Sequence, residues 1–238
     1  KVTYHFAKGS SAFGREANGE VYSTVKSDLS PSTGLIGSWY FDEGMGTAAF
    51  DSSGNGNNGN IINGPAWIDG KKSYALNFNG VSNYLEIPNS APLNPSSSIT
   101  VMAWVKSSAS LYNVPWSIVS KYTAYILGPP DWSTNNMCFI IFTSAGWQYS
   151  SCYAPSDVTQ WHHFAGTYDS ATGEKKLYAD GALQGATTPG GSISYDSGPV
   201  DIGQRECCLG QVFNGAIDEV KIYNRTLSAA EILAEYNS

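Results

Sequence analysis

From Leu35 onward, short segments with apolar residues at every second position alternate with clusters of Gly, Asn, Ser, Pro and Asp. A period of two places apolar side chains on one face of a β-strand, and the intervening residue types favour turns. The segments with this pattern are GSWYF, YALNF, NYLEI, SITVMAWVK, WSIVSK, YTAYIL, CFIIF, WHHFAGTY, KKLYAD, PVDIG and AIDEVKIY. Strands do not alternate with helices, so the sequence predicts an antiparallel all-β sandwich and not a parallel α/β sheet.

Composition supports this prediction and limits the possible partners. The chain has 238 residues, 42% of them hydrophobic and 14% charged, so it can bury a sizeable core and is not disordered as a whole. Its formal net charge of −7 disfavours binding to nucleic acid or to an anionic membrane surface. The longest apolar stretch, Met137 to Phe142, is far shorter than the ~20 residues that span a bilayer, and we expect no membrane insertion.

The two ends of the chain differ from this pattern. Residues 1–33 are predicted to form an N-terminal arm that contains a short alternating strand, Val2 to Phe6, and the main domain covers residues 34–238. At the other end, Ser228 and Glu231 have the spacing of a capping box, and Leu227 with Ile232 fits the hydrophobic staple around it. A short C-terminal helix is therefore expected from about residue 228 to about residue 236.

Four cysteines are present, and two of them suggest a disulfide. Cys138 and Cys152 lie symmetrically about Ala145, in two alternating runs separated by a Ser-Ala-Gly turn. In an antiparallel hairpin of this register they face each other within disulfide reach, so we predict a Cys138–Cys152 bridge; two inert buried thiols are the alternative.

The remaining cysteines, Cys207 and Cys208, are adjacent. They would form a strained vicinal ring, pair with another chain or stay reduced, and a crossed pairing with the hairpin cysteines is a further alternative. Disulfides form in oxidising compartments, so we expect an extracellular or cell-surface protein.

Several longer motifs resemble one protein family in order and approximate spacing. They are GLIGSWYFDEGMGTAAFDSSGNGNNGNI, ALNFNGVSNYLEIPNS, SITVMAWVK, WHHFAGTYD, KKLYADGAL and FNGAIDEVKIYNRTLSAAEI. Over residues 34–237 the chain resembles the laminin-G-like, concanavalin A-like lectin/glucanase domains of laminin G type 3. The resemblance implies a two-sheet antiparallel jelly-roll sandwich that binds carbohydrate, glycoconjugate or protein, often with one calcium ion.

The segments FDEG and DSSGNGNNG offer hard oxygen ligands on a glycine-rich loop, which suits calcium. We expect a structural calcium ion held by backbone carbonyls and a subset of Glu43, Asp51, Asn55 and Asp218, the last of these if the first and last strands are neighbours, as the resemblance implies. Asp218 and Glu219 would point to opposite faces of their strand, so only one of them can be a ligand. The alternative is that the Asp and Asn residues only supply turn conformations.

Catalysis is not expected. Trp161-His162-His163 places consecutive imidazoles on opposite strand faces, where they cannot chelate one ion. Glycanases of the related fold carry a run that resembles Glu-x-Asp-x-Glu, whereas Asp201 has no acidic neighbour in its strand. The sequence also lacks a Gly-x-Ser-x-Gly elbow and a glycine-rich phosphate loop.

Aromatic residues are dense between Leu111 and Asp157, and two of them follow turn residues directly. Trp132 and Trp147 are therefore predicted to expose their rings for stacking on sugars, with Asp131 and Gln148 near the sugar hydroxyls. Arg205, next to Cys207 and Cys208, could border the same rim. The alternative is that these rings cap the ends of the core.

Two functions fit the sequence. The first is a non-catalytic, secreted or surface-displayed module that binds carbohydrate or a glycoprotein and contains structural calcium. The second is an assembly subunit of an extracellular layer or filament, in which the strand Val2 to Phe6 pairs with the sheet edge of another copy of the chain.

Overall fold

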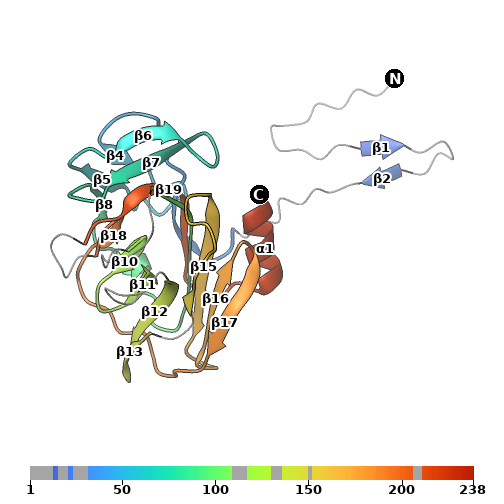
Figure 1. The fold of residues 1–238 in the computed structure, drawn as a ribbon. Helices are drawn as coiled ribbons and strands as arrows, with labels where there is room; N and C mark the ends of the chain where they lie inside the picture. The colour runs from blue at the N-terminus through green and yellow to red at the C-terminus, as the bar shows by residue number, and fades with distance from the viewer. Residues whose placement is uncertain are drawn as a thin grey trace.

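The computed structural model describes residues 32–108, 117–129, 136–149, 152–205 and 211–238, together with the backbones of two short N-terminal strands. In these residues the fold is the predicted sandwich of two antiparallel sheets with one C-terminal helix (Figure 1). The N-terminal strands β1 (Phe13–Arg15) and β2 (Val21–Ser23) pair with each other. The predicted strand from Val2 to Phe6 lies outside the described residues.

Nine strands form the first sheet, which we call sheet I. Its order is β13-β12-β11-β10-β18-β8-β5-β4, and β14 pairs with β12 beside β13. The strands are β4 (Ala48–Ala49), β5 (Gly59–Ile62), β8 (Tyr84–Ile87), β10 (Val119–Lys121), β11 (Tyr125–Gly128), β12 (Met137–Thr143), β13 (Gly146–Gln148), β14 (Cys152–Tyr153) and β18 (Val200–Ile202).

Eight strands form the second sheet, sheet II, in the order β17-β16-β15-β9-β19-β7-β6, with β3 paired to β19. They are β3 (Leu35–Trp39), β6 (Ala66–Asp69), β7 (Tyr74–Asn79), β9 (Ser98–Ser107), β15 (His162–Asp169), β16 (Glu174–Ala179), β17 (Ala182–Thr187) and β19 (Asn214–Tyr223). The pairing of β3 with β19 confirms that the first and last strands of the domain are neighbours.

The main core lies between the two sheets and follows the predicted alternation. In β12, Phe139 and Ile141 point into this core, whereas Cys138 and Ile140 belong to a separate cluster on the outer face of sheet I. The sheets approach closely beside Phe139, because a Cβ atom on Gly166 of β15 would lie only 2.1 Å from the Phe139 ring. A larger residue at position 166 would therefore push the sheets apart.

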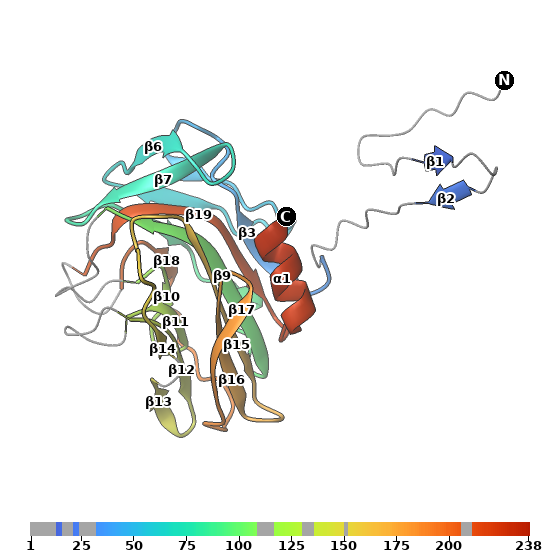
Figure 2. The same cartoon turned by 45° about the vertical axis from the view of Figure 1, so that its right-hand side comes forward.

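Helix α1 (Ala229–Asn237) covers part of the outer face of sheet II (Figure 2). The Ser228 hydroxyl accepts from the Glu231 N–H and the Glu231 carboxylate accepts from the Ser228 N–H, which confirms the predicted capping box. Leu227 and Ile232 are both buried against sheet residues. Because the apolar face of α1 covers this sheet, strand β9 is buried on both faces, which explains its nearly continuous apolar sequence.

A short 3-10 helix, η1 (Ala91–Leu93), links β8 to β9. In the part of the chain that the structure describes, no helix has the length and apolar character needed to cross a membrane.

Candidate functional site

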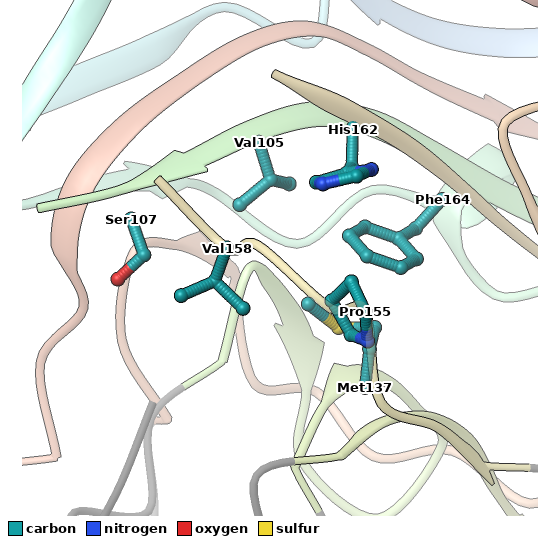
Figure 3. A pocket seen from close by; sticks show the side chains of 7 residues that line it. All are labelled: Val105, Ser107, Met137, Pro155, Val158, His162 and Phe164. Carbon is teal, nitrogen blue, oxygen red and sulfur yellow. The ribbon is translucent and has the colours of Figure 1, made fainter. Parts of the chain in front are cut away.

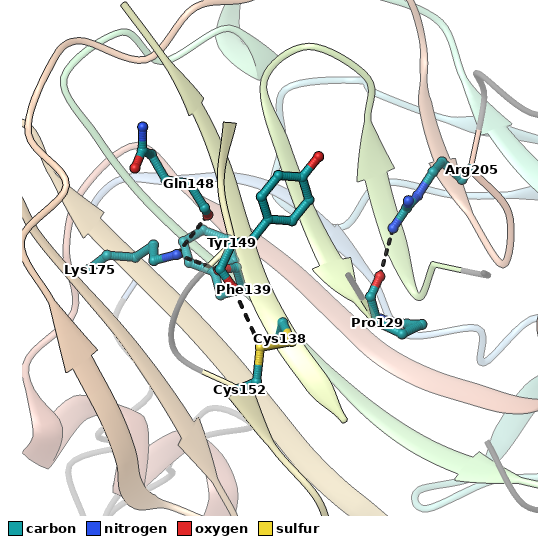
Figure 4. Close-up of a disulfide and its surroundings, with 8 residues drawn as sticks. All are labelled: Pro129, Cys138, Phe139, Gln148, Tyr149, Cys152, Lys175 and Arg205. Atoms are coloured by element: carbon teal, nitrogen blue, oxygen red, sulfur yellow. Dashed lines mark hydrogen bonds between the residues drawn. A yellow bond between two sulfur atoms is a disulfide. The ribbon is translucent and has the colours of Figure 1, made fainter. Parts of the chain in front are cut away.

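The hairpin formed by β12, β13 and β14 contains the predicted disulfide between Cys138 and Cys152, which are directly paired (Figure 4). Farther toward the turn, Ile141 pairs with Gln148. Between this pair and the disulfide, the chain that runs back from the turn contains one residue more than β12 does. This bond excludes the crossed pairing of either hairpin cysteine with Cys207 or Cys208. Those two cysteines lie outside the described residues.

Four aromatic side chains gather at the turn end of this hairpin, and we call them the aromatic cluster: Tyr122, Phe142, Trp147 and Tyr149. Trp147 is at its centre, with ring centroids 4.8 Å from Phe142, 5.7 Å from Tyr122 and 6.2 Å from Tyr149. Trp147 is half-buried, and Tyr149 is 46% exposed. The cluster therefore offers aromatic surface to solvent, chiefly through Tyr149, whereas the Trp147 ring is more enclosed than the predicted loop tip.

Two hairpins bring the cluster together. Phe142 and Trp147 are a cross-strand pair on the outer face of sheet I, where Trp147 also packs against the cluster that contains Ile140. Tyr122 comes from the turn between β10 and β11, in which Thr123 has a φ of 61°. The Phe142 N–H donates to the Ala124 carbonyl at 2.8 Å and joins this turn to β12.

A distant segment, residues 194–196, borders the aromatic cluster. The Ser194 N–H donates to the Phe142 carbonyl at 2.9 Å, and the Thr123 hydroxyl donates to Asp196 Oδ2 at 2.7 Å. Tyr195 is 50% exposed and Asp196 is also exposed. Sequence reasoning missed this segment, because it is 73 residues from Thr123 and only the sheet pairing brings it there.

A buried lysine of sheet II forms hydrogen bonds to the backbone of this hairpin (Figure 4). Lys175 of β16 is fully buried, and its Nζ donates to the carbonyls of Gln148 at 2.7 Å and Phe139 at 3.0 Å. Burial lowers the pKa of Lys175 to about 8. These bonds tie sheet II to the strand that carries Trp147.

The other predicted ligand-binding residues do not join the aromatic cluster. Gln148 pairs with the inward-facing Ile141, and its side-chain amide donates to the carbonyls of its own turn at Ala145 and Gly146. Gln148 therefore lies on the opposite strand face from Trp147, and its predicted place beside that ring is wrong. Asp131 and Trp132 lie outside the described residues.

Arg205 lies at the other end of β12. Its Nη2 donates at 2.7 Å to the carbonyl of Pro129, the residue directly after β11 (Figure 4). Its Nε donates to the Ser117 hydroxyl. The end of β11 pairs with Cys138, four residues along β12 from Phe142, which corresponds to ~13 Å. Arg205 and Trp147 therefore do not share one compact site.

The predicted calcium ligands already have hydrogen-bond partners. Asp51 accepts four bonds, from the N–H groups of Ser38, Ser53 and Asn57 and from the Ser53 hydroxyl. A carboxylate has about four lone-pair sites, so Asp51 has none left for an ion in this arrangement. The Asn55 amide donates to the Leu35 carbonyl and to the Ser53 hydroxyl.

Glu43 and Asp218 retain acceptor capacity. Glu43 Oε1 accepts from the Phe50 N–H, and Glu43 Oε2 is buried with no partner among the described residues. Asp218 accepts hydrogen bonds from the N–H groups of Lys71, Lys72 and Glu219. These bonds lower the pKa of Asp218, but burial outweighs them and raises it to about 7. Among the described residues, no three His, Cys, Asp or Glu side chains lie close enough together to hold a metal ion. Calcium therefore stays a prediction, and a calcium site here would need carbonyl and amide oxygens as additional ligands.

Asp218 and Glu219 also depart from simple strand alternation. β19 has a bulge between Asp218 and Lys221, and Glu219 has a φ of 50°. Both acidic residues are buried, and Glu219 lies 3.5 Å from the Lys72 ammonium and 3.8 Å from that of Lys221. Glu219 therefore belongs to an ion-pair network with these two lysines.

The adjacent residues His162 and His163 contact different parts of the fold. The ring nitrogens of His162 contact Asp180 Oδ2 at 2.7 Å and the Asp157 carbonyl at 2.6 Å, so both are occupied. His163 is buried beside Trp104. The pair does not converge on one point.

A small pocket also borders His162, and its lining is mostly apolar (Figure 3). It is formed by Val105, Ser107, Met137, Pro155, Val158, His162 and Phe164. The space in it is about 10 Å³, which is roughly the room that one water molecule requires. This pocket is too small for a sugar.

One carboxylate pair was not foreseen. Asp201 has no acidic neighbour in its own strand, but it pairs directly with Glu86 of β8. Asp201 is almost completely buried, and its Oδ2 accepts from the Gln204 amide at 2.9 Å. Burial and this amide contact fit a structural acceptor on sheet I.

The model of the concanavalin A-like lectin/glucanases superfamily, laminin G type 3, matches residues 79–233. A search among curated proteins finds no match. Among solved structures, domain 4 of AbnA, an extracellular GH43 arabinanase of Geobacillus stearothermophilus in complex with arabinotriose, is similar at a TM-score of 0.69 and 22% identity. That similarity covers 85% of this chain and 98% of the AbnA domain.

Toxin binding domains share the fold as well. The binding domain of Paraclostridial Mosquitocidal Protein 1 has a TM-score of 0.69 and 17% identity, over 87% of this chain and 52% of that one. The binding domain of botulinum neurotoxin DC in complex with SialylT has a TM-score of 0.66 and 12% identity, over 87% and 52% of the two chains. This chain thus spans about half of these toxin domains.

Proposed function

Because the chain belongs to the concanavalin A-like lectin/glucanase superfamily, we propose that it is a non-catalytic binding module for carbohydrate or glycoconjugate. The aromatic cluster on the outer face of sheet I is the observation that carries this proposal. Partly exposed rings offer apolar faces on which the C–H side of a sugar can stack. Similar folds occur in toxin binding domains and in an arabinanase domain in complex with arabinotriose, which supports the same function.

We place this module outside the cytoplasm. The Cys138–Cys152 bond supports that location, because disulfides persist in oxidising compartments.

Calcium is a separate part of the proposal. Glu43 and Asp218 have the remaining acceptor capacity among the predicted carboxylates, and Glu43 Oε2 is a buried oxygen for which an ion would supply a partner. Bound there, calcium would supply positive charge that holds the loop between β3 and β4 in place. It is not expected to contact the sugar.

Binding measurements on the full chain test the carbohydrate proposal. Trp147→Ala and Tyr149→Ala should each reduce affinity for oligosaccharides on a glycan array, by ~0.5–1.5 kcal/mol in follow-up calorimetry. Phe50→Ala is a matched control, because Phe50 is 58% exposed and lies in the loop before Asp51, away from the β12–β13 hairpin.

One pair of results would contradict the carbohydrate proposal. If both cluster variants bind as the wild type does, and Trp147→Ala unfolds with the ~3–5 kcal/mol loss of a core tryptophan, the cluster caps the core and is not a sugar site.

A further inference from the structure

We propose that the aromatic cluster selects uncharged sugars over anionic ones, and that Asp196 sets this preference. The inference rests on the proposed carbohydrate-binding function and adds the chemical class of the ligand. It is carried by the position, exposure and hydrogen bonds of Asp196.

Asp196 is held at the border of the aromatic cluster by two bonds, one to each carboxylate oxygen. Oδ2 accepts from the hydroxyl of Thr123, the residue after Tyr122, at 2.7 Å, and Oδ1 accepts from the Gly198 N–H at 2.8 Å. The same segment is fixed to Phe142 through the Ser194 N–H. The carboxylate therefore has a defined position against the turn that carries Tyr122, one of the four rings of the cluster.

The negative charge of Asp196 faces solvent. Within the described residues, Asp196 forms no ion pair with a lysine, an arginine or a histidine. A cation does lie behind this segment, because Lys121 donates through Nζ to the Gly198 carbonyl and to Asn89 Oδ1. Lys121 is fully buried, however, so a ligand on the cluster would meet the carboxylate and not the ammonium group.

These features favour hydroxyl groups and oppose acids. Each oxygen of Asp196 accepts one bond here and retains a lone pair, so the carboxylate can accept two more hydrogen bonds. Sugar hydroxyls donate such bonds, and bonds to an ionised acceptor are stronger than neutral ones. A sialic acid, uronic acid or sulfate at the same place would meet like charge, which is a means of rejecting unwanted ligands.

The substitution Asp196→Asn separates charge from structure. An asparagine side chain keeps an oxygen that can accept from the Gly198 N–H, so it supports the same local turn while it removes the charge. Asp69→Asn is the matched control, because it changes the net charge by the same amount on an exposed residue of β6, at the far edge of sheet II.

The test uses the full chain on an array that presents each neutral oligosaccharide beside its sialylated, sulfated or uronic acid form, for example lactose beside 3′-sialyllactose. The wild type should bind neutral members and lose signal on their acidic partners. The ratio of the binding signal on a neutral oligosaccharide to the signal on its acidic form should fall by on the order of tenfold in Asp196→Asn. Asp69→Asn should leave this ratio unchanged.

Equal or stronger binding to acidic forms by the wild type, or an unchanged ratio in Asp196→Asn, would overturn the proposed selectivity and leave carbohydrate binding standing. Absence of any signal that depends on Trp147 would overturn the binding function, and the selectivity with it.

Discussion

His163 illustrates how burial determines the charge of a single residue. Its ring packs against both Trp104 and Tyr236, with centroid distances of 5.4 Å and 6.2 Å. Its Nδ1 has no hydrogen-bond partner among the described residues. Desolvation, together with the nearby charge of Lys221, lowers the pKa of His163 to about 3.

This shift predicts that the contribution of His163 to stability is lost in acid. The unfolded chain takes up the His163 proton near pH 6.5, and the folded chain only near pH 3, so the stability from neutral His163 is present above pH 6.5 and is lost as the pH falls toward 3. Between pH 7 and pH 5 the wild type should lose roughly 2 kcal/mol through this residue. Urea unfolding of the wild type and of His163→Phe at both pH values isolates this loss as the difference between the two proteins, because the raised pKa of Asp218 acts in the opposite direction in both. An identical loss in both proteins would contradict this account.

At the scale of elements, the β12–β14 hairpin is held from two sides. The Cys138–Cys152 bond closes its open end, and Lys175 of sheet II holds the carbonyls of Phe139 and Gln148. The rings of Trp147 and Tyr149 are on this segment. Their placement therefore depends on cross-links that lie outside the aromatic cluster itself.

Removal of the disulfide should destabilise the domain. The bond joins residues 14 positions apart, and a loop of ~15 residues contributes up to ~3 kcal/mol in the chain-entropy model. We expect the double variant Cys138→Ala with Cys152→Ala to lower the free energy of unfolding by up to that amount in urea titrations. Reductant should destabilise the wild type similarly and leave the double variant unaffected; a reductant effect of equal size on both would refute this source of stability.

Helix α1 combines apolar packing with a buried ionic contact. Glu235 accepts from the Lys221 ammonium at 2.7 Å and from the Tyr223 hydroxyl at 2.7 Å. All three groups lie under the helix and are buried. Such a pair is costly to break, because removal of one partner leaves an uncompensated charge, so it specifies where the helix docks on sheet II.

At the scale of the whole molecule, calcium would act by linkage between ligand binding and folding. If an ion is held by Glu43 and Asp218, it stabilises the folded domain by ~2.7 kcal/mol when its concentration is one hundred times the dissociation constant. EDTA should then lower the melting temperature of the wild type, and Glu43→Gln should remove that sensitivity. Asp196→Asn, which removes a carboxylate beside sheet I, is the control that should keep it. A melting curve that EDTA does not move would count against calcium.

The local features of this fold were predictable because each of them depends on residues that are close together in the sequence. Strand alternation, the capping box of Ser228 and Glu231, and the facing of Cys138 and Cys152 depend on spacings within one strand, one helical turn or one hairpin. The family motifs add the order of the strands.

The candidate site depended instead on contacts that no local pattern encodes. Asp196 reaches Thr123 across 73 residues, and Asp218 reaches the N–H of Lys71 across 147. Even within the hairpin, the register placed Gln148 on the inner strand face, because a shift of one residue reverses the face of every side chain. The sequence by itself thus determined the kind of fold, the helix cap and the disulfide. The tertiary structure decided which side chains share a surface, because strand order and register are properties of the packed sheets.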